Sequence, residues 1–256
     1  MIYKFNNLLE HVRMHERKTN NIRIGLYPGA FKPPHVGHYQ AAIENLAKND
    51  IVYVIISGKS RGEGKDKITA EESEKIWNLY RSFNGDRSLR IVRADNHIDS
   101  GTGAVSTVIS ATYDTVHLIN NDGEFTPTTK YTEPHPVAKQ IYTDLKEFDI
   151  CSVTVHAGKE DFSGRYSNFP FDGVDPDQRY IGKRVDKVRR GQNKRLASAS
   201  SIRPYIASYR KTDIKSSNDI RERILAGALK YDDFASIRKN LPGDDDLKDA
   251  VIDILL

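Results

Sequence analysis

Cysteine is almost absent from this 256-residue sequence, which contains only Cys151. A single cysteine cannot form an internal disulfide, and its apolar surroundings predict a buried strand position. Long apolar runs are lacking too: the longest, residues 51–56, is far too short to span a bilayer, and the first residues have no signal-peptide core. A net charge of +4 gives no global argument for nucleic-acid binding. These absences predict a cytoplasmic protein that does not span a membrane, and the global charge does not favour nucleic acid as a partner.

The composition is that of a globular protein, with 38% hydrophobic and 29% charged residues. Apolar and β-branched runs predict strands at residues 22–27, 51–56, 89–94, 115–119 and 150–156. Helical spacing of apolar residues, together with an N-cap and capping-box pattern at 69–72, predicts helices at residues 6–18, 39–48, 69–83 and about 137–148. A further pair of amphipathic helices is predicted beyond residue 217, with apolar faces formed by Ile220, Ile224 and Leu225 and by Leu247, Val251 and Leu255.

Strands that alternate with helices predict parallel βαβ units with right-handed crossovers. The fold class expected is therefore α/β: a Rossmann-like open parallel sheet of about five strands, with helices on both faces and a helical C-terminal extension. The expected domains are an N-terminal extension (1–21), an α/β domain (22–210) and the C-terminal extension (211–256). In such sheets ligands bind outside the carboxyl ends of the strands, which here are followed by residues 29–38, 57–61 and 157–161.

The most informative segment is residues 29–38, GAFKPPHVGH, directly after the first predicted strand. Glycines allow a ligand to approach the main chain, and paired prolines stiffen the turn. His35 and His38 are three residues apart, so at the start of a helix they share one face. Two histidines alone favour a surface or metal-binding pair. The strand, glycine turn and helix around them favour hydrogen bonds to phosphate oxygens and to a departing phosphate.

This segment resembles the GxFxPxHxGH signature of the nucleotidylyltransferase superfamily, which includes adenylyltransferases of NAD and coenzyme A synthesis and cytidylyltransferases of lipid and wall precursors. The resemblance extends over about residues 22–209. It implies catalytic roles for His35, His38 and Lys32. It also implies nucleotide-binding roles for Gly29, Ala30, Phe31 and Gly37.

A second segment, SASSIR at residues 198–203, resembles the ISxTxxR-type motif of the same superfamily. Read alone, this serine cluster favours a plain helix cap. Its place between the sheet and a helix supports a functional role. The resemblance implies a clamp for the β- and γ-phosphates, to which Arg203 would contribute a bidentate guanidinium as a catalytic residue. The resemblance implies that Ser198, Ser200 and Ser201 bind the nucleotide.

A third segment, HAGKED at residues 156–161, looks like the end of the fifth strand in this superfamily. It implies nucleotide-binding roles for Gly158, Lys159 and Asp161. Acceptor-binding roles are expected for Lys59, Arg61 and Arg165. A solvated charged loop explains Lys159 and Arg165 equally well, and basic loops such as residues 59–67 are more often merely solvated. Residues 183–195 contain seven basic residues and one acid, and their role as a lid, a binding patch or a solvated loop stays open.

The resemblance implies direct transfer of a nucleoside monophosphate from a nucleoside triphosphate to a phosphate-bearing small molecule, with release of pyrophosphate. One Mg²⁺ carried by the triphosphate is expected, and no protein metal site. With Phe31 and a proline before the first histidine, the segment resembles adenylyltransferases for nicotinamide mononucleotide or phosphopantetheine more than cytidylyltransferases. This resemblance favours ATP as donor and nicotinamide mononucleotide as acceptor.

Two alternatives stay open. One is a cytidylyltransferase acting on a phosphorylated alcohol or sugar; the other is a non-catalytic nucleotide- or RNA-binding protein, which the basic 183–195 segment supports. The HVGH segment also resembles the HIGH motif of class I aminoacyl-tRNA synthetases, but the chain lacks a KMSKS element. The C-terminal amphipathic helices can pack on the core or on a partner subunit, so a homo-oligomer also stays open.

Overall fold

The computed structural model describes residues 21–85, 87–95, 104–127, 132–157 and 199–256. Within these ranges the sheet has four strands: β1 (Asn21–Gly29), β2 (Ile51–Ser57), β3 (Leu89–Ala94) and β4 (Asp149–Val155). All neighbours pair in parallel, in the order β3-β2-β1-β4. The expected α/β class with an open parallel sheet is confirmed. Every residue of β2 is buried, as the uninterrupted apolar run predicts for a strand covered on both faces.

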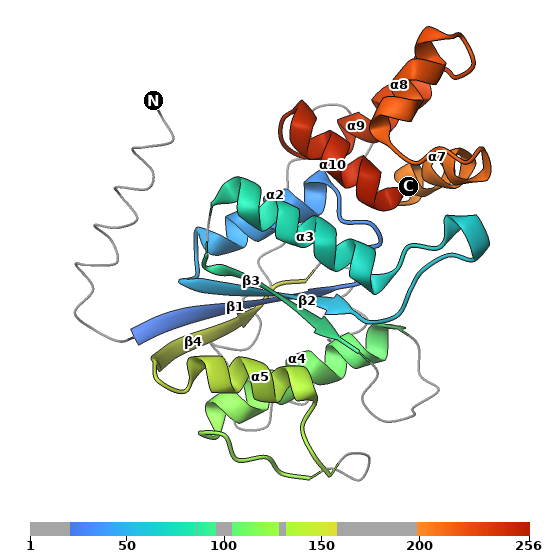
Figure 1. Ribbon diagram of the computed structural model, residues 1–256. Helices are drawn as coiled ribbons and strands as arrows, with labels where there is room; N and C mark the ends of the chain where they lie inside the picture. Colours follow the sequence, from blue (N-terminus) through green and yellow to red (C-terminus); the bar gives the residue numbers. More distant parts are fainter. Residues whose placement is uncertain (1–20, 86, 96–103, 128–131, 158–198) are drawn as a thin grey trace, which may run out of the picture.

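Helices cover both faces of this sheet (Figure 1). On one face lie α2 (Val36–Leu46), α3 (Ala70–Asn84) and the C-terminal helices; on the other lie α4 (Ala104–Asn120) and α5 (Pro136–Leu145). The helix α3 begins with the predicted capping box, in which Thr69 Oγ1 accepts from the N–H of Glu72 and the Glu72 carboxylate accepts from the N–H of Thr69. It ends at Gly85, whose φ of 68° is the left-handed conformation that favours glycine.

The prediction of about five strands is too high for the described part of the chain, because residues 115–119 are helical. They form the last part of α4. The β-branched residues at 115, 116 and 119 give this stretch its strand character in the sequence. In the fold, Val108, Ala111 and Thr115 repeat at helical spacing and are buried, and the Thr115 hydroxyl donates to the carbonyl of Ala111 at 2.6 Å.

The prediction that Cys151 is buried is also wrong, since its side chain is exposed. Along β4 the pairing passes from Ile22 with Ile150 to Arg23 with Ser152, which leaves Cys151 unpaired in a bulge. An edge strand with a bulge can turn such a residue to solvent. The bulge therefore explains why local apolarity misleads here.

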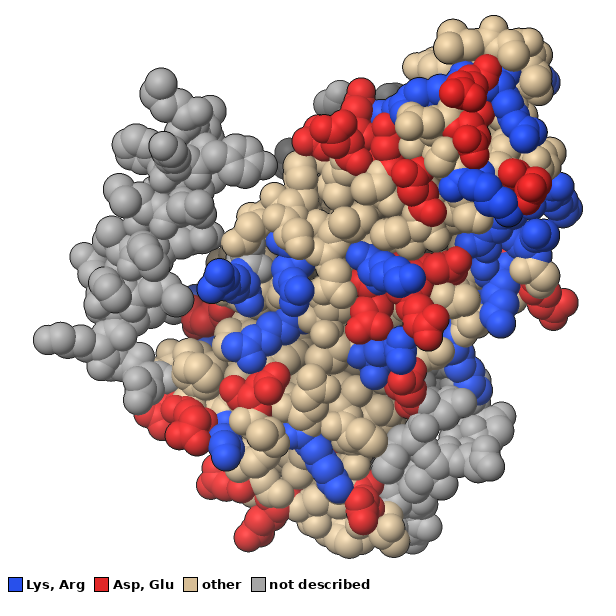
Figure 2. Space-filling view, viewed as in Figure 1, with Lys and Arg blue, Asp and Glu red and all other residues tan. Residues whose placement is uncertain are grey.

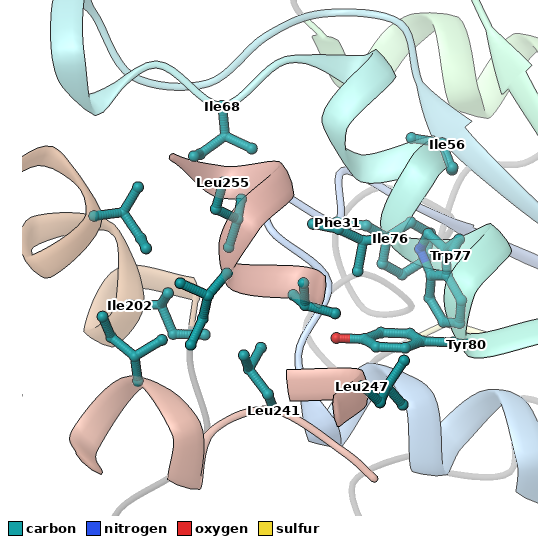
Figure 3. Packing of buried hydrophobic residues seen from close by; sticks show 14 of the residues in the cluster. Phe31, Ile56, Ile68, Ile76, Trp77, Tyr80, Ile202, Leu241, Leu247 and Leu255 are labelled. Atoms are coloured by element: carbon teal, nitrogen blue, oxygen red, sulfur yellow. The ribbon is translucent and has the colours of Figure 1, made fainter. Parts of the chain in front are cut away.

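The C-terminal helices are α7 (Ala199–Lys211), α8 (Ser217–Leu225), α9 (Tyr231–Lys239) and α10 (Asp245–Leu255). Their apolar side chains join those of α2, α3 and the sheet in one buried cluster, part of which Figure 3 shows around Trp77 and Leu255. The predicted apolar faces of α8 and α10 are confirmed at Ile220, Leu247, Val251 and Leu255, all of which are buried. Leu225 departs from the prediction, because it is 87% exposed at the end of α8.

None of the helices in the described ranges combines the length and the apolarity needed to cross a membrane. The three domain boundaries stay predictions. The expected N-terminal helix at residues 6–18 lies outside the described residues.

Candidate functional site

The glycine-histidine turn lies where the order of the strands reverses. From β1 the chain continues to β2 on one side, whereas β4 pairs with β1 on the other side. The carboxyl ends of these strands meet: Gly29 is aligned with Ile56, and the N–H of His156 donates to the carbonyl of Leu26 at 2.7 Å. The turn between β1 and α2 therefore stands at the topological switch point, where open α/β sheets bind their ligands.

His35 is the N-cap residue of α2, which begins three residues earlier than the sequence predicts. Its Nδ1 accepts a hydrogen bond from the N–H of Gly37 at 3.1 Å. An imidazole nitrogen that accepts has no proton, so in the neutral ring the proton is on Nε2. Burial lowers the pKa of His35 to about 4, and the ring is therefore neutral near pH 7. The cap thus fixes a tautomer that can donate through Nε2.

His38 stacks on His35, with ring centroids 3.7 Å apart and an angle of 27° between the planes. The edge of Phe31 meets it from another side, with ring centroids 5.0 Å apart. Its Nδ1 is buried and has no hydrogen-bond partner within the described ranges. Burial, and then the neighbouring His35, hold the pKa of His38 well below 6.5. The two histidines are therefore a pair of neutral rings with polar nitrogens available to a ligand.

The main chain around the histidines is already engaged. The N–H of Val36 donates to the carbonyl of Asn240 at 2.9 Å, and the N–H of Gly37 is held by His35. Two of the free N–H groups expected at the start of α2 are thus satisfied within the protein. An anion at this helix terminus would depend mainly on the imidazoles. The sequence gives no signal for Asn240, which lies at the far end of α9.

Lys32 is buried, with 2% of its surface exposed. Its Nζ donates to the carbonyls of Ala30 at 2.8 Å and Ser57 at 2.9 Å, so it ties the end of β1 to the end of β2. Burial, together with the positive charge of Arg93, lowers the pKa of Lys32 to about 8. Both of these hydrogen bonds are to main-chain carbonyls rather than to carboxylates. Lys32 is therefore a fixed positive charge beneath the turn rather than a mobile arm.

Two side chains of α3 hold the turn between β1 and α2 by hydrogen bonds to its carbonyls. Ser73 Oγ donates to the carbonyl of Phe31 at 2.7 Å, and the Tyr80 hydroxyl donates to the carbonyl of Pro34 at 3.3 Å. Phe31 has a φ of 50°, which is rare for a residue with a side chain, and its ring packs so close to Gly29 that a Cβ there would lie 2.6 Å from it. Phe31 thus requires glycine at position 29. The two hydrogen bonds from α3 connect residues that are 42 and 46 positions apart in the sequence, so the motif alone could not predict them.

The second predicted motif lies at the start of α7. Ser200 and Ser201 fall within its first turn, and Arg203 follows one turn further along. Ile202 is fully buried in the same apolar cluster as Phe31 of the turn, which places α7 on the same face of the sheet as α2. Arg203 is half-buried, and its Nε has no hydrogen-bond partner within the described ranges. A buried guanidinium nitrogen without a partner is costly unless a ligand binds it.

The loop between β2 and α3 carries the predicted acceptor residues Lys59 and Arg61. Arg61 is exposed, and its main chain pairs with that of Ile68 in an antiparallel bridge, at 2.9 and 2.8 Å. A short 3₁₀ turn, η1 (Gly64–Asp66), lies within this bridge. Ile68 is buried in the core. The loop is therefore closed by its own hydrogen bonds and anchored at its base.

Several predicted site residues lie outside the described residues. They are Gly158, Lys159, Asp161, Arg165 and Ser198, together with residues 183–195. The side chains of Ser200 and Ser201 are likewise not described. Within the described ranges, no group of three or more His, Cys, Asp or Glu side chains is arranged to hold a metal ion. The binding roles assigned to the undescribed site residues and to the two serines therefore stay predictions.

Neither a protein-family model nor a curated protein matches this chain. Among solved structures, a protein from Vibrio parahaemolyticus provisionally assigned as a nicotinate-nucleotide adenylyltransferase matches over 90% of this chain and 98% of its own, with 12% identity and a TM-score of 0.37. A NadR protein in complex with NAD and AMP-PNP matches over 92% of this chain and 66% of its own, with 16% identity and a TM-score of 0.36.

A third structure is the nicotinic acid mononucleotide adenylyltransferase of Plasmodium falciparum, complexed with APC. It matches over 57% of this chain and 55% of its own, with 14% identity and a TM-score of 0.29. Because every one of these TM-scores is below 0.5, the likenesses carry no argument about the fold or the activity of this chain.

Proposed function

We propose that this chain is a nucleotidyltransferase that moves AMP from ATP to a phosphate-bearing small molecule and releases pyrophosphate. One observation supports this most: the neutral histidine pair stacked at the switch point of the sheet, with the tautomer of His35 set by its own helix cap. Because both rings are neutral, such a pair offers hydrogen-bond donors to a phosphate group without carrying a positive charge of its own. It is suited to stabilise charge that develops between the α-phosphate and the leaving pyrophosphate.

In this proposal the acceptor phosphate attacks the α-phosphorus in line, and the bond to the bridging oxygen of the pyrophosphate breaks. The Nε2–H of His35 and the ring of His38 donate to phosphate oxygens on the side of the leaving group. The protein forms no covalent bond to the nucleotide. Its contribution is to orient two anionic reactants and to neutralise the charge of the transition state.

Lys32 and Arg203 supply the positive charges. Lys32 acts from beneath the turn as a buried ammonium group that the carbonyls of Ala30 and Ser57 hold in place. Arg203 would bind the β- and γ-phosphates through its guanidinium group, whose Nε has no partner among the described residues. Mg²⁺ bound to the triphosphate would add Lewis-acid charge neutralisation.

The acceptor is proposed to be nicotinamide mononucleotide, because the PPHVGH order around His35 resembles adenylyltransferases for that compound and for phosphopantetheine. Lys59 and Arg61 are placed near its phosphate in this proposal. They belong to the loop that directly follows β2, at the same edge of the sheet as the histidine turn.

The test is pyrophosphate release by the purified chain with Mg²⁺. ATP and CTP are each paired with nicotinamide mononucleotide, nicotinate mononucleotide, phosphopantetheine and a phosphorylated sugar. We expect release with ATP and a mononucleotide, and a loss on the order of a hundredfold in the His38→Ala variant. Unchanged turnover in that variant would show that the role assigned to His38 is wrong.

A cytidylyltransferase would instead release pyrophosphate with CTP and the phosphorylated sugar. RNA binding that weakens steeply with salt, without pyrophosphate release from any pair, would favour the non-catalytic alternative.

A further inference from the structure

Arg210, in the last turn of α7, makes four hydrogen bonds to three different parts of the protein. Its Nε donates to the carbonyl of Leu255 at 2.7 Å, and its Nη2 donates to the Glu72 carboxylate at 2.6 Å. Its Nη1 donates to the carbonyl of Lys67 at 2.6 Å and, more weakly, to that of Lys65 at 3.4 Å. The side chain is only 12% exposed. No other described arginine joins three elements in this way.

These contacts meet at the loop between β2 and α3. Lys65 and Lys67 belong to that loop, and Glu72 caps α3 directly after it. Leu255 ends α10, so the same guanidinium also ties the C-terminal helix to the loop. Figure 1 shows α7 lying beside this loop, and Figure 2 shows Lys and Arg side chains gathered over the same side of the molecule. Arg210 therefore sets the distance between α7 and a basic loop.

The phosphate-clamp residue Arg203 lies on the same face of α7. Arg210 comes seven positions after Arg203, which is close to two helical turns, so both side chains project from one side of the helix. Ile206 and Ala207 on this side are buried, whereas Pro204 and Ser208 are exposed. The anchored end of the helix thus fixes the rotation of α7 about its axis, and with it the direction of the unpaired guanidinium of Arg203.

We infer that Arg210 is a positioning residue for triphosphate binding: it holds α7 against the β2–α3 loop so that Arg203 and the loop lysines face the same phosphate groups. This inference rests on the proposed function. Lysine cannot replace Arg210, because an ammonium group has no planar set of five donors and cannot reach three elements at once. All the contacts described for Arg210 are within the protein, and the role inferred for it is to act through Arg203.

The experiment is a double-mutant cycle on the affinity for tripolyphosphate with Mg²⁺, measured by isothermal titration calorimetry on the full chain. The variants are Arg210→Lys, Arg203→Gln and the two combined. We expect Arg210→Lys alone to weaken binding about tenfold, and to have no further effect once Arg203 is glutamine, because Arg210 acts through Arg203. Equal losses in both backgrounds, or wild-type affinity in Arg210→Lys, would overturn the inference.

Two further variants distinguish a loss of positioning from a simple loss of folding. Glu72→Gln removes the charge that pairs with Arg210 but keeps the capping-box acceptor, so it should weaken tripolyphosphate binding less, and again only when Arg203 is present. Arg90→Lys is the matched control: Arg90 bonds Tyr53 and Asp144 at the start of β3, and its replacement should leave the affinity unchanged. A Glu72→Gln loss that persists without Arg203 would also contradict the inference.

The outcome separates this inference from the proposed function. Coupled binding of tripolyphosphate together with a complete lack of pyrophosphate release would retain the inference and reject nucleotidyl transfer. Pyrophosphate release with no coupling between Arg203 and Arg210 would do the reverse.

Discussion

Two histidines cap helices in the same way in this chain, but only one of them has a free donor. His35 and His135 each accept a backbone N–H through Nδ1, at 3.1 and 3.2 Å, at the first turns of α2 and α5. The Nε2 of His135 lies 3.1 Å from the carbonyl of Asp95, whereas no group among the described residues bonds the Nε2 of His35. The same cap thus leaves His35 available to a ligand and uses His135 within the fold.

Replacing each of these histidines with asparagine should separate capping from catalysis. Asparagine is a good N-cap, so α2 and α5 should stay capped in both variants. We expect His35→Asn to retain its thermal midpoint and to lose nucleotidyl transfer on the order of a hundredfold, because a phosphate donor is removed. His135→Asn should retain the transfer rate and lose about 1 kcal/mol of stability with the bond to Asp95. Wild-type turnover in His35→Asn would contradict the role given to this residue.

The charge on Lys32 should appear in the pH dependence of the reaction. Its pKa is lowered to about 8, so the free protein loses this positive charge as the pH rises through 8, well before an ordinary lysine would. If the charge stabilises the transition state, kcat/KM falls above that pH. A Lys32→Met variant should have a lower plateau and no such decline. A flat wild-type profile up to about pH 10 would argue against the catalytic charge.

Among the elements, those with local signals were predicted well. The strand β3 and the capping box of α3 match their predictions, because apolar runs and cap residues act over a few neighbours. The end of α4 was assigned wrongly, because β-branched residues favour strands unless burial at helical spacing outweighs that preference. Tertiary packing decides such cases, and it is not visible in a short window.

In the candidate site, too, features with local sequence signals were predicted and those that depend on tertiary packing were not. The sequence predicts the turn and its histidines, since their chemistry is carried by adjacent residues. It does not predict that Asn240 would occupy the N–H of Val36, that Ser73 would hold the carbonyl of Phe31, or that Arg210 would join three elements. Each of these partners is more than forty residues away along the chain. The folded topology brings them together.

The contribution of the α3 capping box to the free energy of unfolding can be measured with one substitution. Thr69→Ala removes the acceptor for the N–H of Glu72, and we expect a loss of about 1 kcal/mol. Trp77, the only tryptophan, lies in the core of the same helix and reports unfolding in urea. Thr143→Ala is the control, because its hydroxyl is exposed and bonds only within α5. Equal midpoints for the two variants would contradict a stabilising cap.

Over the whole molecule, the C-terminal helices belong to the core that supports the site. Leu247, Val251 and Leu255 of α10 are buried in the cluster that contains Trp77 and Phe31, as Figure 3 shows for its labelled members. The carbonyl of Asn240 also caps the start of α2. The extension predicted at residues 211–256 is therefore continuous with the α/β core in its packing.

A chain that ends at residue 210 should consequently not fold on its own. Removing α8 to α10 would expose the apolar faces of α3 and α7 and leave the N–H of Val36 without its partner. We expect this fragment to yield little soluble protein, and we expect the fluorescence emission of Trp77 to be that of a solvent-exposed tryptophan. A soluble fragment with native circular dichroism and a buried Trp77 would show that the extension is a separate domain.

Whether the site acts on the α-phosphate of a triphosphate is tested most directly by tracing labelled phosphorus from ATP into the products. Full-length protein is incubated with Mg²⁺, nicotinamide mononucleotide and ATP labelled at either the α- or the γ-phosphate. We expect the α-label to move into the dinucleotide product while the γ-label leaves as pyrophosphate, and we expect His38→Ala to slow both equally. Release of the γ-label as inorganic phosphate, with the α-label still in the adenine nucleotide, would contradict the proposed transfer.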